Sequence, residues 1–117
     1  MTTLQIKRAY EPASVNDGTR FLVDRLWPRG IKKENLAIVA WIKEVAPSNE
    51  LRKWFGHDPE RWTEFRRRYR AELKANTTVL QPLREAMKKG GVITLVYSAH
   101  DEEHNQAVVL REWLLAK

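Results

Sequence analysis

Two apolar runs, "RFLVDRL" at residues 20–26 and "VITLVYSA" at residues 92–99, constrain the fold most. Their apolar residues are nearly continuous instead of alternating with polar ones, and the second run is rich in β-branched types. A strand has this composition when both of its faces are covered, as in a parallel sheet with helices on both sides. The runs therefore predict buried strands of an α/β protein.

The other strand candidates are weaker. Residues 4–10 alternate in character and predict a short strand, and residues 11–18 are crowded with turn-forming types. Residues 37–47 do not settle on one period. We favour a further strand there, because β-branched residues are frequent and Pro47 closes the segment, and a helix is the alternative.

Capping signals predict three helices in the middle of the chain. Ser48 caps a short helix that stops at a glycine. Asp58, followed by a proline and a glutamate, begins a helix that runs to about Ala75. The third helix begins at Thr78, with Gln81 completing a capping box, and ends at a pair of glycines.

The chain closes with a loop over residues 100–105 and a largely buried helix over residues 106–117, with Val108, Leu110 and Leu114 among its core residues. With 117 residues, the chain has the length of one domain. We therefore expect a single α/β domain over residues 1–117, with a small, mostly parallel sheet of about four strands flanked by helices.

The amino-acid composition indicates the cellular environment of the protein and the kinds of partner that it attracts. The chain has no cysteine, which excludes disulfides and thiolate chemistry and fits a reducing cytoplasm. No apolar run approaches the roughly 20 residues of a membrane helix, and the first residues do not resemble a signal peptide, so we expect a cytoplasmic protein without membrane contact. The net charge of +6 attracts anions, from phosphorylated metabolites to nucleic acid.

Polar residues follow the predicted strands at their carboxyl ends, where open α/β sheets bind ligands. Three segments end there: residues 24–29, 43–48 and 97–105. The side chains that they offer for chemistry and binding are Asp24, Arg25, Trp27, Arg29, Lys43, Ser48, Tyr97, Ser98, His104 and Asn105.

These residue types suggest roles. The guanidinium groups of Arg25 and Arg29 match the geometry of a phosphate or carboxylate. Asp24 or His104 could move a proton, since the ordinary pKa of histidine is close to neutral. Trp27 and Tyr97 could wall a planar ring. A structural role remains the alternative for each: Arg25 could pair with Asp24 or Glu44 and only hold the loop, and the aromatic residues could belong to the core.

Ser48 is better explained as a helix cap than as a nucleophile, because no "GxSxG" elbow is present. The segment "HDEEH" places His100 and His104 four residues apart, but the metalloprotease pattern requires glutamate directly after the first histidine, and Asp101 stands there. We expect neither a metal site nor a cofactor.

The run "RRRYR" raises the alternative of nucleic-acid binding. On a helix, Arg68 lies between two glutamates, each four residues away, whereas Arg67, Arg70 and Lys74 share a flank with little compensation. Such a face could contact phosphates, although charge runs of this kind are more often solvated. The sequence carries no nucleic-acid-binding motif that supports it.

The blocks "GTRFLVDRLWPRG", "WIKEVAPSNELRKWFGHDPERWTEFRRRYRAEL" and "VITLVYSAHDEEHNQAVVL" resemble the domain of unknown function 488 family, in its short YeaO-like branch. The resemblance covers residues 6–110 and implies a small bacterial or archaeal α/β protein without an established activity. Longer relatives carry cysteines where this chain has Tyr97, Ser98 and residues 104–106, so thiol chemistry does not transfer. Val39 stands near the place of a usual acidic residue.

Three functions are consistent with the sequence. The first is a pocket for a phosphorylated or nucleotide-like small molecule, with or without hydrolase or transferase chemistry. The second is a nucleic-acid-binding module that uses the basic helix face. The third is a protein-interaction scaffold without catalysis.

Overall fold

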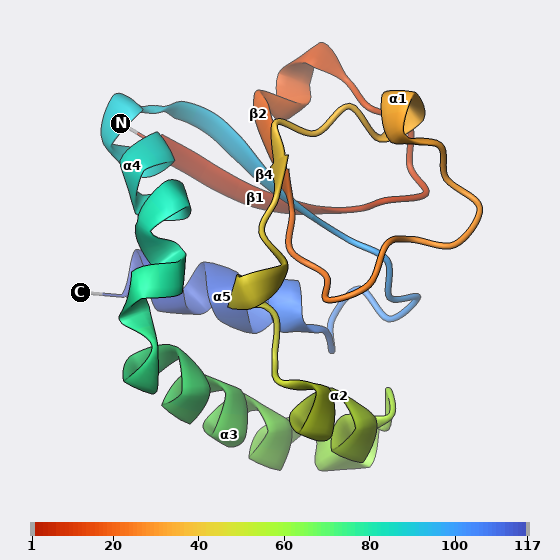
Figure 1. Cartoon of the computed structure of the whole chain (residues 1–117), viewed down its shortest axis with the longest axis vertical. Coiled ribbons are helices and arrows are strands. Elements are labelled where there is room, and N and C mark those ends of the chain that lie inside the picture. Colours follow the sequence, from red (N-terminus) through yellow and green to blue (C-terminus); the bar gives the residue numbers. More distant parts are fainter. Residues whose placement is uncertain (1, 117) are drawn as a thin grey trace.

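The fold is a four-stranded parallel sheet in the order β1-β4-β2-β3, seen in a computed structural model that describes residues 2–116 (Figure 1). The strands are β1 (Thr2–Arg8), β2 (Thr19–Leu22), β3 (Ala40–Trp41) and β4 (Gly91–Tyr97). The α-helices are α1 (Lys33–Leu36), α2 (Asn49–Phe55), α3 (Trp62–Ala75), α4 (Gln81–Lys89) and α5 (Gln106–Leu115). Short 3-10 helices are η1 (Val15–Asp17), η2 (Lys43–Val45), η3 (Pro59–Arg61) and η4 (Thr77–Leu80). The predicted α/β class and parallel sheet are confirmed.

Both faces of the sheet are covered, which explains the continuous apolar runs. Phe21 and Leu95 join the main core, formed with α2, α3, α4 and α5. Leu22 and Val96 point to the opposite face and pack with Leu36 of α1 in a smaller cluster. In Figure 1, α1 accordingly lies on the far side of the sheet from α3. A strand between two apolar layers needs apolar residues at every position.

Residues 37–47 form neither of the predicted elements over their full length. Ala37 adopts a left-handed conformation with φ 53°, and only two residues, Ala40 and Trp41, pair as β3. The chain then turns into the 3-10 helix η2. Because strand, turn and 3-10 geometry follow one another within a few residues, the segment has no single hydrophobic period.

Most of the capping predictions hold. Ser48 accepts a hydrogen bond from the Leu51 amide, and Asp58 accepts one from the Glu60 amide. The capping box at Thr78 is wrong, because residues 77–80 form η4 and the helix starts at Gln81 without a side-chain cap.

In the last helix, Leu110 and Leu114 are buried as predicted, whereas Val108 is half-buried. Its neighbours Ala107 and Val109 are fully buried, which keeps this helix largely within the core.

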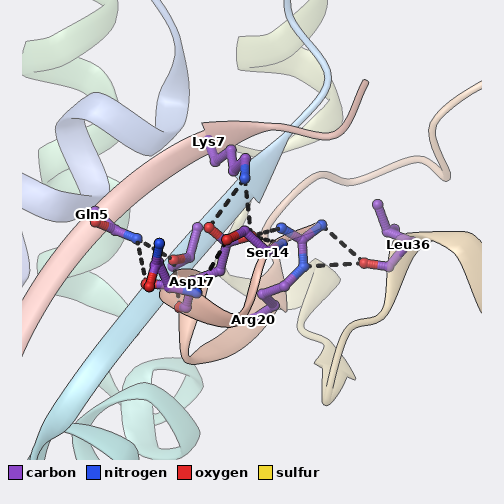
Figure 2. Close-up of polar contacts among 8 residues, drawn as sticks. Gln5, Lys7, Ser14, Asp17, Arg20 and Leu36 are labelled. Carbon is purple, nitrogen blue, oxygen red and sulfur yellow. Dashed lines mark hydrogen bonds and ion pairs between the residues drawn. The ribbon is translucent and has the colours of Figure 1, made fainter. Parts of the chain in front are cut away.

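A buried polar network fixes the connection that enters β2 (Figure 2). Arg20 donates to Asp17 at 2.7 Å and, through Nε and Nη2, to the Leu36 carbonyl at 3.1 and 2.9 Å. Lys7 of β1 donates to both Asp17 carboxylate oxygens at 3.1 Å, and the Ser14 amide donates to one of them. The network therefore joins β1, β2 and α1, and the buried charges of Asp17 and Arg20 satisfy each other.

We expect Arg20→Ala to lower the free energy of unfolding by about 3 kcal/mol, because it leaves a buried carbonyl and carboxylate without their main donor. Urea denaturation measures this change. Arg70→Ala, which breaks an exposed ion pair with Glu112, is the control and should change stability little. Equal effects of the two substitutions would contradict a stabilising role for the buried network.

The same network predicts the response to acid. Burial raises the pKa of Asp17, but hydrogen bonds from Ser14, Lys7 and Arg20 outweigh it and hold the pKa below its usual 3.8. The contribution of Asp17 is therefore present above pH 3.8 and is lost as the pH falls through the lowered value. The stability difference between wild type and Arg20→Ala should shrink over that acidic range.

Candidate functional site

A pocket of about 290 Å³ opens where β2 and β4 end. The pairing of these strands continues one residue past β2, with the Val23 amide donating to the Val96 carbonyl at 3.0 Å. Beyond this bond the two chains diverge, Asp24 into a loop and Ser98 toward α5. Among the residues predicted from sequence, the pocket brings together Asp24, Arg25, Trp27, Arg29, Ser98 and Asn105.

Asp24 is a buried carboxylate, only 6% exposed. Its Oδ2 accepts from the Ser98 amide at 3.0 Å, and its Oδ1 accepts from the Gln106 side chain. Burial raises the pKa of Asp24 above its usual 3.8, and hydrogen bonds from Ser98 and Gln106 offset only part of this effect. Within residues 2–116 it has no ion-pair partner.

Three arginines contribute to the same pocket. Arg25 is half-buried and donates to the carbonyls of Ala46 and Pro47 at 3.1 and 3.2 Å, not to the carboxylates that the sequence suggested as partners. Arg29 is exposed on the loop after β2, and Arg52 reaches the pocket from α2. None of the three pairs with a carboxylate in the described part of the chain.

The loop that carries Arg29 is held by aromatic side chains. The Trp27 indole donates to the Ile31 carbonyl at 2.7 Å, and the Tyr10 hydroxyl donates to the Arg29 carbonyl at 2.9 Å. Trp41 is at the surface, where it meets Trp27 edge-on and donates to the Asp24 carbonyl. Trp27 therefore both lines the pocket and fixes its loop.

Asn105 and Ser98 connect the pocket to the start of α5. Asn105 is buried, caps α5 by accepting from the Val108 amide at 3.2 Å, and donates to the Asp101 carbonyl. Ser98 contributes the amide that binds Asp24. Hydrogen bonds within the protein therefore hold both residues at their positions in the lining.

Four predicted residues do not line this pocket. Lys43 is exposed and its ammonium lies 5.3 Å from the ring centre of Trp41. The Ser48 hydroxyl donates to Glu72 of α3 at 2.7 Å, besides capping α2. Tyr97 lies in the main core, where burial raises its pKa.

His104 is the fourth. Its Nδ1 lies 2.8 Å from an Asp101 carboxylate oxygen, and its ring meets Trp62 edge-on at 5.2 Å. Asp101 also accepts from the backbone amides of Glu103 and His104, so the loop before α5 folds around this carboxylate. Of the two residues suggested for moving a proton, Asp24 therefore lines the pocket and His104 does not.

Among the polar residues of the lining, the sequence patterns missed four: Tyr10, Arg52, His57 and Gln106. Arg52 and His57 come from α2 and the turn after it, and their approach depends on how α2 packs against α3. His57 is left-handed at φ 58°, directly after a left-handed Gly56. A non-glycine residue in this conformation is uncommon, and this turn exposes the imidazole beside the pocket. The glycine stop signal after α2 was the one available clue.

The predicted basic flank of α3 is more compensated than its sequence indicated. Arg67 binds Glu64 through both Nε and Nη2, at 2.8 and 2.6 Å, and Arg68 binds the same carboxylate. Hydrogen bonds from Arg67 and Arg68 lower the pKa of Glu64 to about 2. Arg70 pairs with Glu112 at 3.3 Å, and Lys74 is exposed. Residues three apart on a helix can also form ion pairs, and Arg67 and Glu64 have this spacing. The predicted compensation counted only glutamates four residues away.

Between residues 2 and 116, no group of three or more His, Cys, Asp or Glu side chains could hold a metal ion. None of the helices described is long and apolar enough to cross a membrane.

Asp24→Asn should make the protein more stable than wild type at pH 7, because it removes a buried charge without an ion-pair partner. A raised pKa means that wild-type stability falls as the pH rises through that value. The advantage of Asp24→Asn should therefore shrink toward acid and vanish below pH 3.8, as thermal melts over a pH series would show. A difference in stability that stays constant across the pH series would show that the charge of Asp24 is not its cause.

Comparisons with known proteins show the family to which the chain belongs. The chain is 48% identical over 111 residues to the uncharacterized protein YeaO of Escherichia coli K12, covering 95% of this chain and 96% of that protein. It is 41% identical over 113 residues to the uncharacterized protein Rv3073c of Mycobacterium tuberculosis H37Rv, covering 97% and 94%. No solved structure matches the chain. A family model described as the inactive DUF488-N3 subclade matches residues 3–117, and the chain belongs to this YeaO-like subclade of the DUF488 family.

Proposed function

We propose that this protein binds a small phosphorylated ligand in the pocket at the carboxyl ends of β2 and β4. The observation that carries the proposal is the convergence of Arg25, Arg29 and Arg52 on one concavity, each without a carboxylate partner in the described chain. Guanidinium groups bind phosphate through charge-assisted, often bidentate hydrogen bonds. Arginines without carboxylate partners keep this capacity for a ligand.

The size and shape of the pocket favour a small molecule. Its volume of about 290 Å³ is close to the lower end of the range of about 300–1,000 Å³ typical of such sites. Apolar side chains such as Phe55 and Phe65 contribute to the lining beside the charged groups. This mixture of apolar walls and a few polar groups is characteristic of ligand pockets.

Binding without turnover fits the site better than hydrolysis or transfer. Asp24 is engaged by Ser98 and Gln106, His104 is paired with Asp101, and the Ser48 hydroxyl is bound to Glu72. A nucleophile with a base in hydrogen-bond reach is therefore not formed by the residues suggested from sequence. The description of the subclade as inactive supports the same reading.

The nucleic-acid and scaffold alternatives have weaker support. Within residues 2–116, Arg67 and Arg70 each pair with a glutamate that a second arginine shares, so they are only partly neutralised, and Lys74 forms no ion pair. The exposed large apolar side chains of the described residues come from several elements and loops, and they are Tyr10, Val15, Leu26, Val39, Trp41 and Leu115. The binding experiment below distinguishes both alternatives from the proposed pocket.

We expect inorganic phosphate and ribose 5-phosphate to raise the melting temperature of the wild type, and calorimetry to show binding weakened by about tenfold or more in Arg29→Ala. Arg29 is exposed, so this substitution should leave the fold intact. Arg84→Ala removes an exposed arginine of α4 outside the pocket and is the matched control.

Oligonucleotide binding that disappears at high salt and is indifferent to Arg29→Ala would instead favour the basic face of α3. No response to any phosphate compound would overturn the proposed pocket and leave the scaffold reading.

A further inference from the structure

Asp24 is buried without forming an ion pair in the described chain, and the arginines of the pocket do not explain why. It is nearly as buried as Asp17, at 6% against 4% exposure. Asp17 forms ion pairs with Lys7 and Arg20, whereas Asp24 forms none among residues 2–116 and has only the longer-range charge of His57 acting on it. Burying a carboxylate without a cation is costly, and such groups are usually paired or used in binding.

The carboxylate of Asp24 lines the pocket and has acceptor capacity beyond its protein donors. An ionised carboxylate offers about four lone-pair sites on its two oxygens. The Ser98 amide, the Ser98 side chain and the Gln106 side chain use up to three of these sites. Protein donors therefore hold the group in place and leave it able to accept from a ligand.

The pocket consequently has two poles of opposite charge. Arg25, Arg29 and Arg52 supply the positive pole, and Asp24 supplies a single negative group. A simple phosphate would interact well with the first and would be repelled by the second. A ligand that satisfies both needs an anionic group and a hydrogen-bond donor.

The surroundings indicate which kind of donor. An ammonium group would meet the field of three arginines, which repels a second cation. A neutral N–H donor on a planar ring avoids that cost, and the aromatic side chains of Trp27, Phe55 and Phe65 in the lining suit a flat, apolar-faced group.

We propose that the ligand is a phosphorylated, amino-bearing nitrogen heterocycle of the nucleoside monophosphate class, an inference that rests on the proposed function. Its phosphate would bind the arginines, and its amino group would donate a hydrogen bond to Asp24. Asp24 is then the residue that determines specificity, and the arginines supply affinity that is shared by all phosphate compounds. Gln106 is a positioning residue, because it acts through the Asp24 carboxylate.

The test compares ligands that differ only in the amino group. Calorimetry on the full chain would use AMP against purine riboside 5′-monophosphate, which lacks the 6-amino group, and CMP against its analogue without the 4-amino group. Ribose 5-phosphate reports on the arginine pole alone. We expect at least one amino-bearing nucleotide to bind the wild type about tenfold more tightly than its analogue.

Asp24→Asn should reduce that ratio to about one while ribose 5-phosphate binds as well as before or better, since a negative charge has been removed. Asn preserves the side-chain shape, and a circular dichroism melt checks the fold. Should the variant fail to fold, the wild-type comparison within each nucleotide pair still decides the question.

Two results overturn this inference and leave the proposed function standing. One is Arg29-dependent binding of phosphate compounds with no preference for the amino group in either pair. The other is an Asp24-dependent preference for glucosamine 6-phosphate over glucose 6-phosphate without any nucleotide preference, which would make the donor an ammonium. Absence of binding by every phosphate compound, ribose 5-phosphate included, overturns the proposed function as well.

Discussion

The parallel pairing of β2 with β4 at the centre of the sheet determines where the chemistry of this protein lies. The register sets Leu22 opposite Val96, and the bond from the Val23 amide to the Val96 carbonyl carries it one step further. The next polar contact is between Asp24 and the Ser98 amide. Asp24 and Ser98 are 74 residues apart in sequence, and only this register brings them into contact.

The two buried aspartates on either side of β2 show how burial leads to different roles. Asp17, before the strand, is enclosed by donors and by two cations, and its pKa falls. Asp24, after the strand, is hydrogen-bonded to Ser98 and Gln106 and forms no ion pair in the described chain, and burial raises its pKa. The first is fully explained by the stability of the fold. The second lines a pocket and keeps acceptor capacity that a ligand can use.

The sequence predicts well what depends on one segment at a time. Strands covered on both faces, the Ser48 cap and the Asp58 start were readable because apolar patterning and capping are local. Residues 37–47 were not, since their pairing is limited to two residues by a left-handed Ala37 and by η2.

The candidate site was only partly predictable for the same reason. Asp24, Arg25 and Arg29 follow a strand in sequence and could be placed at its carboxyl end. Arg52 and His57 join them through the packing of α2 against α3, which no local pattern encodes. His104 instead contacts Asp101, three residues earlier in the loop before α5. The positions of the strand ends do not predict this contact.

The short strand β3 bears on how the molecule behaves among its own copies. Exposed strand edges are templates on which other chains add strands and aggregate. At one edge of this sheet β3 offers only two residues, Ala40 and Trp41, beside the charged Lys43. At the other edge Arg111 of α5 donates to the Leu4 carbonyl of β1 at 2.7 Å and occupies a position that a further strand would need. Growth by strand addition is therefore opposed at both edges of the sheet, at one by the shortness of β3 and at the other by the side chain of Arg111.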